Sequence, residues 1–130
     1  MSTPSLPFQH KLPARLRHLW ETLYADRAAF YTIGLAVFLH LVLWFLVVIG
    51  YFQLPPIIPL HFDAFGQPDR IEPRSHIFFL PIIAFGLLLV NGVGGLLLRQ
   101  WVDEFAAYLL WGGTVVLQLL FLIAVLSVIL

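Results

Sequence analysis

The sequence FYTIGLAVFLHLVLWFLVVIGYF, residues 30–52, decides the fold of this chain. It contains no Asp, Glu, Lys or Arg, and two later segments share that property: HIFFLPIIAFGLLLVNGVGGLLL at 76–98 and FAAYLLWGGTVVLQLLFLIAVLSVI at 105–129. Because a helix rises about 1.5 Å per residue, roughly 20 apolar residues cross the hydrocarbon core of a bilayer. Each segment is long enough. The sequence therefore predicts an all-α integral membrane protein with three transmembrane helices.

The composition points to lipid as the solvent of most side chains. Of the 130 residues, 61% are hydrophobic and 11% are charged, whereas a soluble domain is roughly a quarter charged. A soluble chain this small could not bury so much apolar surface. The net charge is zero, so no global field attracts nucleic acid, and no nucleic-acid partner is expected. The absence of cysteine excludes disulfides, thiolate metal sites and cysteine nucleophiles.

Residues 12–29 are predicted to form an amphipathic helix ahead of the first span. Leu16, Leu19 and Leu23 recur at helical spacing, and charged residues such as Arg15 and Glu21 lie mostly between them. We expect this helix to lie on the membrane interface, either as a simple anchor or as a docking face for a partner subunit. The predicted organisation is an interfacial segment, 1–29, followed by a single three-helix transmembrane domain, 30–130.

The basic residues predict how the chain crosses the membrane. Five lie on one side of the predicted spans: Lys11, Arg15, Arg17, Arg27 and Arg99. Arg70 and Arg74 lie on the other side. Since Lys and Arg are enriched in cytoplasmic segments, the N-terminus and the loop between the second and third spans should be cytoplasmic. The protein is thus expected to be a multi-pass protein of the bacterial cytoplasmic (inner) membrane, with the 53–75 loop and the C-terminus outside.

The 53–75 loop, which contains LPPIIPLHFDAFGQPD at 54–69, is the least ordinary part of the sequence. Prolines at its start favour an extended, polyproline-like path. Asp63 and Gly66 fit the first and fourth positions of a turn. A loop this apolar and proline-rich is expected to be ordered and pressed against the outer membrane surface.

This loop resembles the signature of a bacterial membrane domain of unknown function, L-P-x-x-I-P-x-H-F-D-x-x-G-x-P-D. That domain also forms the N-terminal half of the sporulation-delay toxin immunity proteins. The residues that carry the resemblance, here named the recognition loop, are Leu54, Pro55, Ile58, Pro59, His61, Phe62, Asp63, Gly66, Pro68 and Asp69. The resemblance extends to Pro81 and Asn91 and covers roughly residues 30–100. It implies a polytopic membrane fold with the loop outside and, in the immunity proteins, toxin protection and signalling. Those proteins carry further transmembrane segments after this domain.

Small and polar residues within the spans are predicted to mediate helix packing. Small residues let helix backbones approach closely in lipid, and buried amides hydrogen-bond between helices. The residues assigned to this role are Asn91, Gly92, Gly95, Gly112, Gly113 and Gln118. Asp103 is predicted to cap the third span, and Ser75 the second.

His40 and a cluster of histidines and carboxylates in the loop are the candidate ligands. His40 lies near the middle of the first span, where an ionisable residue is a functional hypothesis by default. It could ligate a haem iron or a chlorin magnesium, although hydrogen bonding to another helix is favoured. The loop also gathers His61, Asp63, Asp69, Glu72 and His76, whose spacing follows no established metal site. No metal and no cofactor are therefore expected.

No catalytic constellation can be assembled from the sequence, and three functions remain open. The leading interpretation is a non-catalytic accessory subunit of a larger membrane complex, possibly an electron-transfer complex, with other integral membrane subunits and lipid as partners. The alternative is a stand-alone immunity or signalling protein of the toxin-immunity type. The third is an enzyme or metal-binding protein centred on His61.

Overall fold

The computed structural model describes residues 13–130, so Lys11 and Leu12, on which the charge count and the amphipathic helix partly rest, lie outside the described residues. The elements, in chain order, are α1 (Ala14–Ala25), α2 (Arg27–Tyr51), β1 (Ile57–Phe62), β2 (Pro68–Pro73), the 3-10 helix η2 (Arg74–Phe78), α3 (Phe79–Trp101) and α4 (Glu104–Ile129). In this part of the chain three helical segments, α2, η2 with α3, and α4, are long and apolar enough to cross a membrane. The prediction of three spans is confirmed, and the chain is a multi-pass membrane protein.

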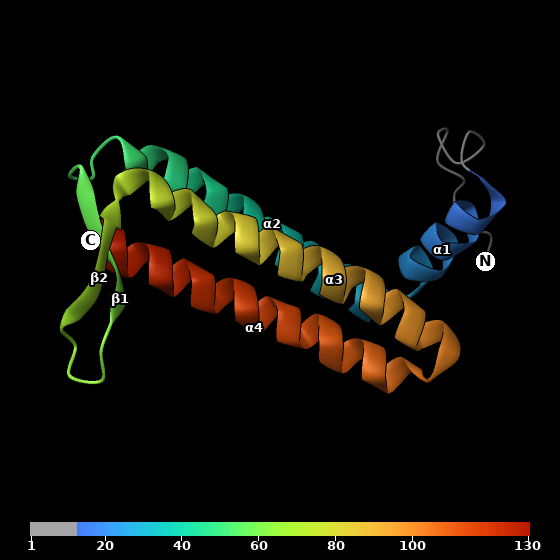
Figure 1. Cartoon of the computed structure of the whole chain (residues 1–130). Helices are drawn as coiled ribbons and strands as arrows, with labels where there is room; N and C mark the ends of the chain where they lie inside the picture. Colours follow the sequence, from blue (N-terminus) through green and yellow to red (C-terminus); the bar gives the residue numbers. More distant parts are fainter. Residues whose placement is uncertain (1–12) are drawn as a thin grey trace.

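The three long helices form one bundle in which α4 packs along both α2 and α3 (Figure 1). Its interior has an apolar cluster at each end. Leu43, Val47, Ile77 and Val125 belong to the cluster at the hairpin end, and Trp111 packs with Ala29 and Ala107 at the other. Between them the buried residues include His40 and Gln118, which are polar. The core is therefore apolar at its ends and polar at its centre.

Two glycines allow helices to touch. A methyl group on Gly95 would overlap the Trp111 indole, and one on Gly50 would overlap the Ile129 side chain. The indole is also fixed, because its Nε1 donates to the Gly92 carbonyl at 3.2 Å. These contacts explain why α3 and α2 approach α4 so closely.

Asp26 separates α1 from α2. Its backbone is extended (φ −93°, ψ 97°), and its carboxylate accepts a hydrogen bond from the Ala29 N–H at 3.2 Å, which caps α2. The same residue ends α1, which buries none of its residues and leaves the bundle at an angle (Figure 1). A helix thus exists where an amphipathic one was predicted, and its position on a membrane interface stays a prediction. Asp103 caps α4 as predicted, accepting from the Ala106 N–H at 2.7 Å.

The all-α prediction is wrong in one respect: residues 57–73 form a β-hairpin. β1 pairs with β2 antiparallel, from Ile57 opposite Pro73 to Phe62 opposite Pro68, with irregular register near His61. Prolines are tolerated because both strands of a two-stranded sheet are edge strands, whose outward N–H groups need no partner. Ser75 does not cap the second span, since η2 precedes α3 and no side chain caps either helix.

Candidate functional site

The hairpin holds most of the recognition loop and turns at Asp63–Gln67. The Gly66 N–H donates to the Asp63 carbonyl at 3.0 Å, and the Asp63 N–H donates to the Gln67 carbonyl at 2.9 Å. Gly66 has φ +76°, a left-handed conformation that costs glycine little. The Asp63 carboxylate also accepts from the N–H groups of Phe65 and Gln67 at 2.8 and 2.9 Å. The turn is therefore fixed by its own residues.

The base of the hairpin is fixed to the bundle. Leu54 and Ile58 are buried in the same apolar cluster as Leu43 and Val47. The Arg74 guanidinium donates to the Leu54 carbonyl at 3.3 Å and lies 4.7 Å from the centre of the Tyr51 ring, within range of a cation–π contact. The Arg74 N–H donates to the Pro56 carbonyl at 2.9 Å. Arg74 thus fastens both ends of the hairpin to α2.

Most ionisable side chains of the hairpin, together with His76 of η2, form two separate groups. The His61 Nδ1 lies 2.6 Å from the Asp69 carboxylate, while Glu72 contacts Arg70 at 2.6 Å and His76 at 3.1 Å. The Arg70 guanidinium, assisted by the His76 imidazole, holds the pKa of the Glu72 carboxyl below its usual value. Among residues 13–130 no three His, Asp or Glu side chains gather in a way that could hold a metal ion. The candidate ligands His61, Asp69, Glu72 and His76 are thus engaged in separate pairwise contacts.

The distal half of the hairpin is exposed. Phe65, at the tip, is 90% exposed, and Phe62 and Ile71 are also exposed. Figure 1 shows the hairpin crossing the end of the bundle, with its turn extending past the end of α4. The hairpin therefore combines a base that is packed on the bundle with an exposed apolar tip.

A second polar constellation lies inside the bundle. The Trp44 Nε1 donates to His40 Nε2 at 2.9 Å, His40 Nδ1 contacts Gln118 Oε1 at 3.2 Å, and Gln118 Nε2 donates to the Ala84 carbonyl at 3.0 Å. His40 also stacks on Phe85, with ring centroids 5.5 Å apart. The network connects α2, α3 and α4 in the middle of the bundle. A buried polar group without a hydrogen-bond partner would cost the most free energy there.

The donors assign the protonation of His40. Because an indole nitrogen can only donate, His40 Nε2 must be the unprotonated acceptor. The proton then lies on Nδ1 and is donated to the Gln118 oxygen, which orients the amide so that its nitrogen faces Ala84. Neither ring nitrogen keeps a free lone pair, so this geometry favours a structural histidine over a haem or chlorin ligand.

The predicted packing residues divide into two sets. Gly95 and Gln118 lie in contacts between helices. Gly92 contributes its carbonyl to Trp111 but, like Gly112 and Gly113, has open space where a side chain would be. Asn91 is half-buried and makes no side-chain hydrogen bond within residues 13–130. A side chain at Gly112 or Gly113 would therefore meet nothing within 4 Å in the described chain, whereas Gly92 contacts α4 through its carbonyl.

The α1 end carries a cluster that the sequence did not reveal. The Asp26 carboxylate accepts from the Tyr108 hydroxyl and from Arg99 at 2.7 Å, and Arg99 also contacts Glu104 at 3.3 Å. The Tyr108 hydroxyl, together with the Ala29 N–H and Arg99, lowers the pKa of the Asp26 carboxyl despite its partial burial. No local motif predicts this cluster, because its members are 73 to 82 residues apart from Asp26; the lone Arg99 beside a predicted span was its one visible signal.

Three membrane-capable helices and an ordered hairpin define a small multi-pass membrane protein. The family model described as "Domain of unknown function (DUF1648)" matches residues 38–85, which comprise most of α2, the hairpin and the start of α3. The match contains His40, Trp44 and the whole recognition loop, and ends before α4.

An uncharacterized protein of Archaeoglobus fulgidus is 42% identical to this chain over 41 residues. The aligned segment is 32% of this chain and 22% of that protein, so the chain matches about a fifth of its relative's length. No solved structure matches the chain. The comparisons therefore assign a domain of unknown function to the α2–hairpin–α3 segment, and they assign no activity.

Proposed function

We propose that this protein is a non-catalytic accessory subunit of a larger membrane complex, in a bacterial cytoplasmic membrane, and that the hairpin is the surface that binds a neighbouring subunit. The observation that carries the proposal is the contrast between the hairpin's base and tip. The base is buried and fastened by Arg74, whereas Phe65 is 90% exposed. A fixed backbone loses little entropy on binding, and exposed aromatic side chains are common anchors of interfaces.

The remaining chemistry of the chain supports recognition in preference to catalysis. Apart from Asp63, which accepts from N–H groups of the turn, the ionisable groups of the hairpin contact one another or His76, and His40 is engaged at both ring nitrogens. The helices also present apolar faces to their surroundings, including open glycines at which another backbone can approach. A partner with its own transmembrane helices would contact both the bundle and the hairpin.

Co-purification tests this proposal. The tagged native chain, extracted from its own membranes in mild detergent, should co-migrate with a defined set of other membrane proteins. Replacement of both Phe62 and Phe65 by Ser should remove that set without changing expression or helical content. Val102→Ser is the matched control, because Val102 is also an exposed apolar residue but lies in the α3–α4 turn at the other end. Its co-purifying partners should be unchanged.

The identity of the partners would show which membrane complex contains this protein as a subunit. Haem- or flavin-containing subunits would support an electron-transfer complex as the assembly that contains this protein. A native chain that purifies alone as a stable monomer would contradict an accessory role.

The alternative function, toxin immunity, rests on the matched segment 38–85, which contains the recognition loop that resembles immunity-type proteins. It predicts that cells lacking this protein become sensitive to a toxin produced by their own species, and that the double Phe62 and Phe65 variant fails to restore resistance. Equal toxin resistance of the deletion strain and its parent would exclude this alternative.

A further inference from the structure

The bend between α1 and α2 forms without a helix-breaking residue. Residues 14–33 contain neither proline nor glycine, and the alanines beside the bend have the highest helix propensity of any residue type. Only Asp26 departs from helical geometry, with ψ 97° in place of about −42°. The Asp26 N–H still donates to the Thr22 carbonyl, and the Phe30 N–H donates to the Asp26 carbonyl. A rotation at one residue therefore separates the bent chain from a continuous helix.

Local interactions favour both forms of this junction. In the bent form, the Asp26 carboxylate caps α2 by accepting from the Ala29 N–H at 3.2 Å, and aspartate is a favourable N-cap residue. In a continuous helix, the backbone N–H groups of residues 27–29 would instead donate to the carbonyls four residues earlier. Those hydrogen bonds would replace the cap. Contacts from other parts of the chain therefore decide which form is populated.

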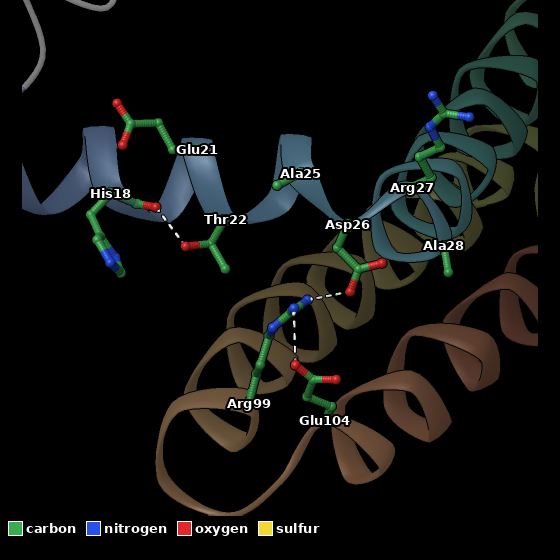
Figure 2. A pocket seen from close by; sticks show the side chains of 9 residues that line it. All are labelled: His18, Glu21, Thr22, Ala25, Asp26, Arg27, Ala28, Arg99 and Glu104. Atoms are coloured by element: carbon green, nitrogen blue, oxygen red, sulfur yellow. Dashed lines mark hydrogen bonds and ion pairs between the residues drawn. The ribbon is translucent and has the colours of Figure 1, made fainter. Parts of the chain in front are cut away.

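These contacts reach Asp26 from α3 and α4. While one oxygen of its carboxylate caps α2, the other accepts from Arg99 at 2.7 Å and from the Tyr108 hydroxyl. Figure 2 shows Arg99 reaching from the end of α3 to Asp26 at the point where α1 meets α2, with Glu104 bonded to the same guanidinium. The side chains of Asp26 and Arg99 are each 15% exposed, so solvent ions screen this pair less than a surface pair.

The surroundings of α1 leave room for this helix to change its angle. α1 buries none of its residues, although Leu23 packs against the apolar cluster that contains Trp111. An open cleft of about 890 Å³ and a smaller cavity of about 200 Å³ lie between α1 and the ends of α3 and α4 that face it. A rotation of α1 at Asp26 would therefore meet little close packing.

We propose that Asp26 is a conformational latch. The hydrogen bonds from Arg99 and Tyr108 hold α1 at its angle to the bundle, and their release joins α1 and α2 into one continuous helix over residues 14–51. In the released form α1 extends along the axis of α2 and no longer faces the end of α3. The latch lies at the opposite end of the bundle from the hairpin, and it does not depend on the function proposed for the hairpin.

Distances between spin labels, measured by pulsed double electron–electron resonance on the full chain in lipid nanodiscs, test this proposal. The chain has no cysteine, so labels attach only at Leu16→Cys and Phe45→Cys. In a continuous helix these positions would be about 44 Å apart, and the native chain should give a shorter distance. Arg99→Gln with Tyr108→Phe, which keeps the Asp26 cap, should add a population near this longer distance. Asp26→Ala, which removes both cap and latch, should give mainly the longer distance.

Two controls separate the latch from general damage to the fold. Glu104→Gln changes a carboxylate that contacts the same guanidinium but not Asp26, so the native distance should remain. A second label pair, at Phe38 and Val93, reports the packing of α2 and α3 and should give the native distance in every variant. The long distance in the native chain would overturn the proposal. Retention of the short distance by Asp26→Ala, or by the double variant, would also overturn it.

Discussion

At single positions, the effect of a glycine on helix packing depends on whether it faces a neighbouring helix or open space. Gly95 lies against an indole that is fixed by its own hydrogen bond, whereas Gly112 faces nothing within 4 Å. Both are helical glycines in the spans, and the sequence assigned both to helix packing. Which face of a helix meets a neighbour depends on the rotation of that helix, and composition does not encode rotation.

This difference predicts opposite effects of the same substitution. Gly95→Ala should lower the free energy of unfolding by about 1–3 kcal/mol, because the new methyl group overlaps Trp111 and a fixed ring cannot move away. Gly112→Ala, its control, should be neutral or raise stability by up to about 1 kcal/mol through helix propensity. Unfolding in mixed detergent micelles measures both values. Equal effects of the two changes would show that Gly95 is not a close contact.

His40 and Gln118 act as one unit, so their effects on stability should not add. Gln118→Leu removes the acceptor for His40 and the donor for Ala84, and should cost about 1 kcal/mol. His40→Phe should cost a similar amount alone but much less in the Gln118→Leu background. A double-mutant cycle of unfolding free energies measures the coupling. Additive costs would contradict the hydrogen-bond chain.

At the level of elements, Asp26 sets where α1 ends and α2 begins, and its carboxylate connects that junction to α3 and α4 through Arg99 and Tyr108. The folded pKa of Asp26 is lowered below the ordinary value of 3.8. A carboxyl with a lowered folded pKa contributes stability that is present above the unfolded value and is lost as the pH falls through the folded value.

The lowered folded pKa of Asp26 predicts how the free energy of unfolding depends on pH. Tyr108→Phe should cost about 1 kcal/mol at pH 7, because the hydroxyl donates to a charged and partly exposed carboxylate. The cost should persist down to about pH 4 and disappear as the pH falls further below 3.8. Unfolding free energies of the native chain and the variant, measured across that range, give the comparison. A cost that is unchanged at the lowest pH would show that the carboxylate is not the acceptor.

The elements also show what the sequence could predict. Three spans were evident because about 20 charge-free residues have no other stable environment than a bilayer. The turn at Asp63–Gly66 was evident because both residue types have specific turn preferences. The hairpin was missed because Pro55, Pro56 and Pro59 argue against strand pairing. Only the structure shows that Pro55 and Pro56 precede β1 and that Pro59 lies in a two-stranded sheet, in which each strand has a free edge. The fastening role of Arg74 was missed for a similar reason, since it depends on contacts with Tyr51 and Leu54.

At the scale of the whole molecule, the orientation predicted from the basic residues has a direct test. The chain contains no cysteine, so Gln67→Cys in the hairpin turn and Gln100→Cys near the end of α3 each introduce one thiol. A membrane-impermeant maleimide added to intact cells should label the first variant and should label the second only after permeabilisation. The reverse pattern would place the hairpin in the cytoplasm.

The hairpin gives the molecule an ordered surface that the bundle does not need for its own packing beyond Leu54, Ile58 and Leu60. Site-specific photocrosslinking from Phe65 in native membranes asks most directly whether another protein covers that surface. A photoreactive phenylalanine at position 65 should yield one adduct of defined higher mass, and the same group at Val102 should not. If Phe65 gave only lipid adducts, or the same adducts as Val102, the hairpin would not be a partner-binding surface.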